Sequence, residues 1–237
     1  RSSGILLHPT SLPGPEGIGD LGPEAYRWID FLAASGIQLW QILPLGPTGY
    51  GDSPYQCFSA FAGNPFLVSP ILLLESGLLK PSDLRQRPEF PELSVDFGPV
   101  IQWKNHLLEL AYNSFVKIKP RKIDEQFQSF CLDNAAWLED YSLFMAIKES
   151  EGGHPWSDWP KPLKFRESSA LNQVREELSA LIEKVKFSQF LFDQQWQNLK
   201  NYAHEKSIRI VGDMPFVIAL DSADTWANPH LFLMDAQ

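Results

Sequence analysis

A glycine-rich loop, residues 46–56, carries aromatic, hydroxyl and acidic side chains at close spacing. Tyr50, Asp52, Ser53 and Tyr55 stand there among three glycines and two prolines, which favour an irregular backbone path. Planar rings can stack on a sugar face, while hydroxyl and carboxylate groups hydrogen-bond sugar hydroxyls. The loop therefore predicts a carbohydrate site, with Tyr50 as a separate, more exposed platform. The alternative is a connecting turn in which Ser53 only stabilises the backbone.

Two further polar side chains follow short apolar segments. Asp213 comes directly after residues 208–211 and is flanked by Gly212 and Pro215. A carboxylate held there can hydrogen-bond ligand hydroxyls or tune a neighbouring acid, although capping of the following turn is the alternative. His8 follows residues 3–7, and it is predicted either as a ligand contact or as a buried histidine with satisfied hydrogen bonds.

Other acidic and aromatic residues are open to a structural interpretation. A helix cap with a packed indole explains Asp221, Asp224 and Trp226 about as well as a binding role does. For Trp156 and Trp159, core packing is favoured over a sugar platform.

The elements that must position these residues are three predicted strands, at 3–7, 39–45 and 208–211. A helix is predicted between the first two, because Pro23 suits a first helical position and apolar residues recur at helical spacing up to Gly36, a typical stop. A strand–helix–strand unit with short connections implies parallel pairing. Because ligands bind at the carboxyl ends of parallel strands, the three polar loops are expected at one edge.

About 100 residues separate the second loop from a long helical tract at 171–203 that leads to the third strand. Prolines break the first half of this insertion, whereas helical spacing dominates at 103–115 and 135–147. We expect a barrel-like part at 1–66, a mostly helical insertion at 67–165, and a second barrel-like part at 166–237.

Composition excludes several classes of partner. The net charge of −9 disfavours nucleic acid and anionic membranes, and no apolar segment approaches the roughly 20 residues needed to span a bilayer. Cys57 and Cys131 lie far apart and are expected to be reduced thiols rather than metal ligands. A neutral ligand fits this balance, and no cofactor is indicated.

The visible residues do not supply a complete hydrolytic centre. Retaining glycoside chemistry needs two carboxyl groups about 5 Å apart, and no second carboxylate resembles Asp213 in its position after a strand. The sequence also lacks a phosphate-binding loop, a zinc ligand set and a nucleophile elbow.

Several segments closely resemble the 4-α-glucanotransferase family, also called amylomaltase or disproportionating enzyme. They occur in family order along the whole chain: residues 4–14 (GILLHPTSLPG), 17–22 (GIGDLG), 40–47 (WQILPLGP), 51–55 (GDSPY), 59–65 (SAFAGNP), 190–196 (FLFDQQW) and 212–215 (GDMP).

The resemblance implies the amino-terminal part of a (β/α)8 TIM barrel, an α/β fold, with a helical insertion after the second strand. It implies transfer of α-1,4-glucan segments between maltooligosaccharides or starch chains, with glucose as an acceptor and a covalent intermediate on an aspartate. That nucleophile and a glutamate acid/base match no residue here and are expected beyond Gln237. The fragment alone is therefore expected to be inactive.

The resemblance also implies roles for individual residues. Asp52, Ser53 and Tyr55 resemble donor-side sugar contacts, Tyr50 resembles part of a secondary glucan site, and Asp213 resembles the acidic residue that ends the third strand. The form of the loop at 48–52 resembles bacterial members, which implies a bacterial cytoplasmic enzyme rather than a plastid one. A related α-glucan hydrolase and a non-catalytic glucan-binding fragment remain the alternatives.

Overall fold

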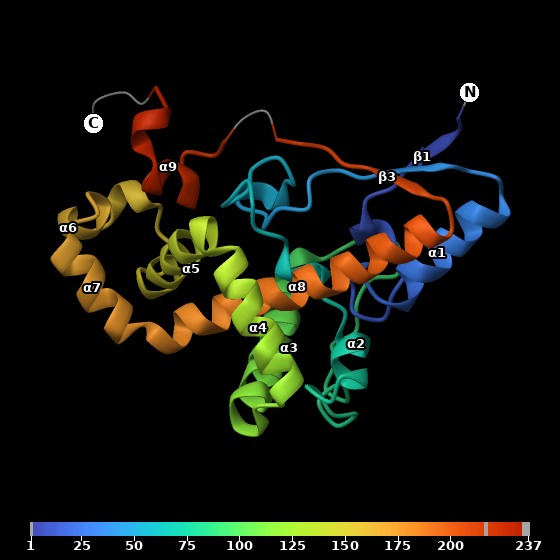
Figure 1. Cartoon of the computed structure of the whole chain (residues 1–237), viewed down its shortest axis with the longest axis horizontal. Coiled ribbons are helices and arrows are strands. Elements are labelled where there is room, and N and C mark those ends of the chain that lie inside the picture. Colours follow the sequence, from blue (N-terminus) through green and yellow to red (C-terminus); the bar gives the residue numbers. More distant parts are fainter. Residues whose placement is uncertain (1, 216–217, 234–237) are drawn as a thin grey trace.

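The computed structural model describes residues 2–215 and 218–233, and in this part three short strands form one parallel sheet (Figure 1). The strands are β1 (Gly4–Leu6), β2 (Leu39–Gln41) and β3 (Arg209–Val211), and β2 lies in the centre. Trp40 of β2 is in register with Ile5 of β1 and Ile210 of β3. The predicted parallel sheet is confirmed.

The strands are shorter than the predicted 3–7, 39–45 and 208–211. Strand pairing of β2 ends at Gln41, after which the amide of Ile42 makes one more hydrogen bond, to the carbonyl of Val211 at 3.0 Å. Pro44 has no amide hydrogen to donate, so the ladder cannot continue through it. Apolar composition alone did not show where pairing stops.

Similar helix ends lead the chain into β2 and β3. Helix α1 (Pro23–Ala34) ends before Gly36, whose φ is +70°, and the amide of Ile37 donates to the carbonyl of Leu32 at 3.0 Å. Helix α8 (Ser179–Glu205) ends before Ser207, whose φ is +61°, and Ile208 donates to Ala203 at 2.8 Å. A left-handed residue followed by this backward hydrogen bond reverses the chain within two residues.

Helices occupy most of the chain between β2 and β3. They are α2 (Pro70–Glu75), α3 (Phe97–Ile118), α4 (Arg121–Asp133), α5 (Ala135–Ser150), α6 (Lys161–Lys164), α7 (Ser168–Glu177) and α8. A further helix, α9 (Ala223–Ala227), follows β3, and short 3-10 turns lie at Pro9–Ser11, Tyr50–Asp52, Pro65–Leu67, Trp156–Asp158 and Pro229–Leu231.

The helices predicted at 103–115 and 135–147 are confirmed within α3 and α5, and the helical tract predicted at 171–203 is confirmed by α7 and α8. Helix α4 was not predicted, although Phe127 and Phe130 on one of its faces are buried. The long tract at 171–203 is two helices, because Leu178 leaves helical geometry with φ −103° and ψ 17°. Neither glycine nor proline marks that break in the sequence.

Two hydrophobic cores meet along α8, which crosses the middle of the molecule (Figure 1). One core joins the sheet and α1 to α3, α4 and the central and carboxyl-terminal parts of α8, and Trp40 and Phe187 are fully buried in it. The other joins α5, the short helices after it and α9, and it contains Trp156, Trp159 and Trp226. The predicted packing role of the first two indoles is confirmed. The division at residues 66 and 165 stays a prediction.

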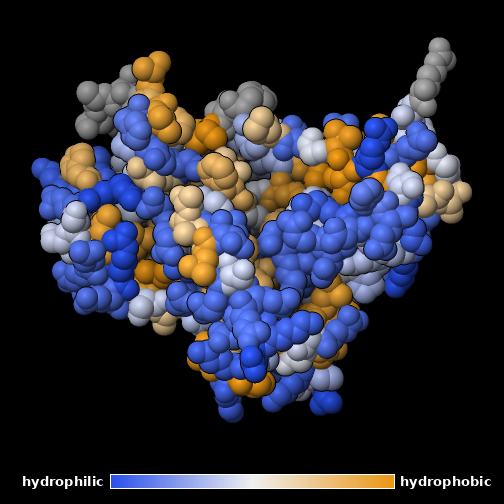
Figure 2. Space-filling view, in the orientation of Figure 1, coloured by the Kyte–Doolittle hydropathy of each residue, from blue (hydrophilic) through white to orange (hydrophobic). Residues whose placement is uncertain are grey.

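The face shown in Figure 2 is mostly hydrophilic, with apolar patches near the strands and around α9. Exposed apolar side chains at the strands include Leu6 and Val211, and Met214 follows β3. Within the described ranges, no helix combines the length and apolar character needed to cross a membrane.

Replacing Trp40 with alanine should destabilise the protein by about 3–5 kcal/mol, as expected for truncation of a large buried ring. The indole is completely buried in the central strand, and its Nε1 donates to the carbonyl of Leu7 at 2.7 Å. Urea denaturation measures the change. Leu93→Ala is the control, because Leu93 is fully exposed and its truncation should change stability by less than about 0.5 kcal/mol. Equal unfolding midpoints for both variants would contradict the central role of Trp40.

Candidate functional site

The loops after β2 and β3 meet through a direct hydrogen bond between two predicted site residues. The Tyr55 hydroxyl donates to Oδ2 of Asp213 at 2.6 Å, although the two residues are 158 positions apart. The other carboxylate oxygen, Oδ1, accepts from the amide of Met214 at 2.8 Å. These two bonds fix the orientation of an exposed carboxylate at the carboxyl edge of the sheet. The sequence therefore placed Tyr55 and Asp213 at the same edge correctly.

The loop that carries Tyr55 is closed at its base. Residues Thr48 and Cys57 form an isolated antiparallel bridge, and the Gly49 amide donates to the carbonyl of Gln56 at 2.8 Å. A Cβ atom on Gly49 would lie only 2.8 Å from that carbonyl oxygen, so a side chain there would force the base open. Gly49 thus permits the close backbone approach that closes the base of the loop.

The other predicted residues of this loop have mixed local roles. The Ser53 hydroxyl accepts from the amide of Tyr55 at 3.3 Å, which is the turn-stabilising interaction considered as its alternative. Asp52 is partly exposed in left-handed geometry, with φ +53°, next to Gly51 at φ +67°. The backbone of Tyr50 belongs to the 3-10 turn, but its side chain lies outside what the structure describes.

His8 lies at the end of β1 and connects that loop to the chain after β2. Its Nδ1 accepts from the amide of Thr10 at 3.3 Å and lies 2.7 Å from the hydroxyl of the same residue. Its Nε2 lies 3.3 Å from the carbonyl of Pro44, so the neutral tautomer with hydrogen on Nε2 satisfies both sides. Burial lowers the pKa of His8. Both ring nitrogens of His8 thus have partners within the protein, as expected for a buried histidine with satisfied hydrogen bonds. Ligand contact by His8 stays a prediction.

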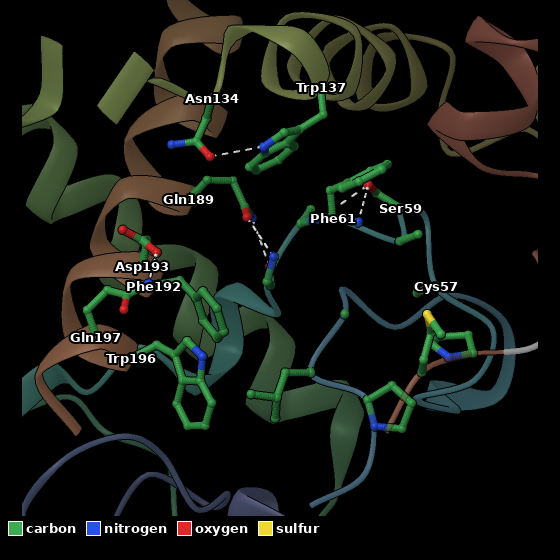
Figure 3. A pocket seen from close by; sticks show the side chains of 18 of the residues that line it. Cys57, Ser59, Phe61, Asn134, Trp137, Gln189, Phe192, Asp193, Trp196 and Gln197 are labelled. Atoms are coloured by element: carbon green, nitrogen blue, oxygen red, sulfur yellow. Dashed lines mark hydrogen bonds between the residues drawn. The ribbon is translucent and has the colours of Figure 1, made fainter. Parts of the chain in front are cut away.

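Asp213 also lines a cleft of about 340 Å³ that sequence reasoning did not identify (Figure 3). Phe61 on the loop after β2 is two-thirds exposed and stacks on Trp137 of α5, with ring centroids 6.4 Å apart and an interplanar angle of 20°. Polar groups of the lining include Asn134, Asp193 and Gln197, and Trp196 projects from α8 (Figure 3). Cleft residues lie in two of the segments singled out in the sequence: Phe61 in 59–65, and Phe192, Asp193 and Trp196 in 190–196. Nothing in the sequence indicated that these two segments meet.

Two buried glutamines of α8 bind the backbone at residues 63 and 69, and the first of these contacts lies in the wall of the cleft. Gln189 donates to the carbonyl of Gly63 at 2.9 Å and accepts from its amide at 2.8 Å. Gln195 makes the corresponding pair of bonds with Ser69. A Cβ atom on Gly63 would lie 2.0 Å from the Phe192 ring, so this close approach requires glycine.

The electrostatics of the site follow from its hydrogen bonds and burial. The bond to the Asp213 carboxylate raises the pKa of Tyr55, because ionisation would break it and place two negative charges together. Burial raises the pKa of the Cys57 thiol beside the cleft, and both cysteines are free. Across the described ranges, no group of three or more His, Cys, Asp or Glu side chains is arranged to hold a metal ion.

Aromatic and acidic side chains at the carboxyl edge of a parallel sheet are typical of an α/β carbohydrate-active protein. The family model described as 4-alpha-glucanotransferase matches residues 7–237. The chain is 50% identical to a 4-alpha-glucanotransferase from Thermus thermophilus and 48% identical to one from a Synechocystis strain, in both cases over its whole length and 47% of the relative. The chain therefore belongs to the 4-alpha-glucanotransferase family, which confirms the resemblance found in the sequence.

Solved structures support the same assignment. The amylomaltase from Streptococcus agalactiae in complex with acarbose matches 99% of this chain and 47% of its own, with a TM-score of 0.94 and 39% identity. An amylomaltase from Corynebacterium glutamicum, at 17% identity and a TM-score of 0.77, shows the similarity of fold alone. The chain spans about half the length of the curated relatives it matches.

Asp213→Asn should lower the pKa of Tyr55 towards the ordinary tyrosine value of 10.0, since the neutral amide no longer penalises the phenolate. In the parent protein the raised pKa means that this bond stabilises the fold below pH 10 and is lost as the pH rises through the folded pKa. Ultraviolet difference titration measures the shift. Subtracting the titration of Tyr55→Phe isolates this tyrosine, and an unchanged Tyr55 titration in Asp213→Asn would rule out the bond.

His8 should titrate below the ordinary histidine value of 6.5, with the hydrogen of its neutral form on Nε2. Because burial lowers the folded pKa, the contribution of neutral His8 to stability is present above pH 6.5 and lost as the pH falls through the folded pKa. NMR titration of the ring nitrogens checks both points. A His8 pKa above 6.5 or hydrogen on Nδ1 would disagree with this geometry.

Proposed function

We propose that this protein transfers α-1,4-glucan segments between maltooligosaccharides or starch chains and uses glucose as an acceptor. The observation that carries the proposal is the Tyr55–Asp213 hydrogen bond, which joins two loops at the carboxyl edge of the sheet in a chain of the 4-alpha-glucanotransferase family. The similar Streptococcus agalactiae amylomaltase was solved in complex with acarbose, which supports an oligosaccharide-binding role for the corresponding fold.

We propose that Asp52, Ser53 and Tyr55 contact the donor sugar and that Asp213 accepts hydrogen bonds from its hydroxyls. A phenol oxygen and a carboxylate retain free lone pairs after bonding each other, so both can still accept from a sugar. Tyr50 is proposed to contribute to a secondary glucan site. His8 would act at the rim through its link to the chain after β2.

The three strands are proposed to be the first three of a (β/α)8 barrel, with a mostly helical insertion after the second strand. In the described residues β1 and β3 each pair with β2 alone, so each offers its other edge to a further strand. The proposed parts are residues 1–66, 67–165 and 166–237. Support comes from the long helical stretch between β2 and β3 and from the similarity to solved amylomaltases.

The proposed chemistry is a retaining double displacement. An aspartate attacks the anomeric carbon while a glutamic acid protonates the departing glycosidic oxygen; the glutamate then takes the proton from an acceptor hydroxyl that displaces the aspartate. We propose that residues after Gln237 supply both carboxyl groups, and that the residues described here bind and orient the donor chain. Glycosyl transfer of this kind needs no cofactor. Exclusion of water decides between transfer and hydrolysis.

The proposed setting is the bacterial cytoplasm. The chain is 45–50% identical to several bacterial relatives and 40% identical to a chloroplast or amyloplast relative from Solanum tuberosum. The bacterial form of the loop at residues 48–52 agrees with this assignment.

The test is incubation of the protein at its natural length with maltotriose. We expect glucose together with oligosaccharides longer than maltotriose, separated by chromatography. Tyr55→Ala should lower kcat/KM about 10- to 100-fold, the effect of losing one site contact and the orientation of Asp213. Leu93→Ala, which changes an exposed side chain, should leave kcat/KM unchanged. Reducing sugar without chain lengthening would support the hydrolase alternative instead.

A further inference from the structure

A buried lysine joins three segments that lie far apart in the sequence. Lys148, near the end of α5, is only 8% exposed. Its ammonium donates to the carbonyls of Gly153 at 3.0 Å and His154 at 3.3 Å, and to Oδ2 of Asp221 at 2.5 Å. It also lies 5.1 Å from the centre of the Phe58 ring, within range of a cation–π interaction.

The segments that Lys148 contacts are also bonded to each other. The amide of Ala223 donates to the carbonyl of Phe58 at 2.8 Å, and the amide of Ala60 donates to a carboxylate oxygen of Asp224, also at 2.8 Å. These bonds hold the loop after β2 against the chain before and within α9. The second oxygen of Asp221 accepts from the Trp156 amide at 3.2 Å, which adds the turn after α5 to the same junction.

The chemistry of this junction requires a positively charged hydrogen-bond donor. Three donors meet three acceptors, so the donor capacity of the lysine is used completely. Burial of a charge is unfavourable unless it is paired and hydrogen-bonded, so this group persists only while all three segments stay in place. A methionine of similar length would fill the space but remove the lysine's donor from the Gly153 carbonyl and from Oδ2 of Asp221, while the His154 carbonyl would keep only its bond from the Trp159 indole.

Lys186 provides a comparison within the same chain. It is also 8% exposed, but it pairs with Glu139 at 2.7 Å and Glu183 at 3.6 Å. Its partners lie on α5 and on its own helix, and neither belongs to the loops after β2 or β3. Lys148 and Lys186 are therefore equally buried, but of the two only Lys148 contacts the loops after β2 and β3.

We propose that Lys148 is a positioning residue that holds residues 57–62 against residues 221–224 and thereby sets Tyr55 opposite Asp213. Phe58 follows Tyr55 closely on one loop, and Asp221 follows Asp213 on the other. The expected effect of Lys148 on kcat/KM rests on the proposed glucan transfer. Its expected effect on the contact between the two segments does not. Lys148 itself does not touch the Tyr55–Asp213 pair, so it acts through the two segments.

The test compares Lys148→Met with Lys186→Met in the protein at its natural length. Amide hydrogen exchange should become about tenfold faster or more at Ala60 and Ala223 in Lys148→Met, because loosening the junction exposes both amides. In Lys186→Met both amides should exchange as in the parent. With maltotriose as substrate, Lys148→Met should lose at least tenfold in kcat/KM at matched folded fractions, and Lys148→Arg should recover part of the loss.

Asp221→Asn is the second variant, in case Lys148→Met does not fold. The Asp221 side chain is about one-third exposed, so this substitution should destabilise the fold less than Lys148→Met does. It should still accelerate amide exchange at Ala60 and Ala223. Parent-like exchange in the folded variants, or equal acceleration in Lys186→Met, would overturn the proposal. If the parent shows no glucan transfer, the proposed function fails, whereas the exchange comparison still decides whether Lys148 positions the loops.

Discussion

The parallel pairing of β2 with both of its neighbours is the constraint on which the rest of the site depends. Parallel strands end at the same edge, so the residues that follow β1, β2 and β3 begin close together whatever their separation in sequence. His8 reaches the carbonyl of Pro44, and Tyr55 reaches Asp213, because of this shared edge. A strand that entered from the opposite direction would carry its loop to the other end of the sheet.

Strands of three residues bury little surface, so helices must hold the sheet in register. Both reversals into β2 and β3 use a left-handed residue and a backward hydrogen bond at a helix end, which fixes where each strand begins. Helix α8 belongs to both hydrophobic cores, and its glutamines also bind the backbone at Gly63 and Ser69. The same helix therefore supports the sheet and one wall of the cleft.

Local sequence signals predicted the strands, the parallel sheet, α1 with its Gly36 stop, and the shared edge at which the loops of Tyr55 and Asp213 lie. Those features depend on the backbone preferences of glycine and proline or on the periodicity of apolar residues, and both can be read from a short stretch of sequence. Strand ends, the Phe61–Trp137 stack and the contacts of Lys148 were missed. Each arises from residues brought together only by the fold, such as Phe58, Gly153 and Asp221 around one ammonium group. Spacing along the chain contains no record of such contacts.

Internal hydrogen bonding separates the candidate residues by how freely they can meet a ligand. Both nitrogens of His8 have partners, so a new contact there competes with existing ones. The Ser53 hydroxyl accepts from the Tyr55 amide, which ties its orientation to the turn but leaves its hydrogen for a ligand. Tyr55 and Asp213 differ, because their mutual bond uses the phenolic hydrogen and leaves acceptor lone pairs on both oxygens. A donor hydroxyl can therefore bind without breaking the pair. Since its geometry is fixed before binding, the ordering cost is reduced, which favours this pair as the central contact of the site.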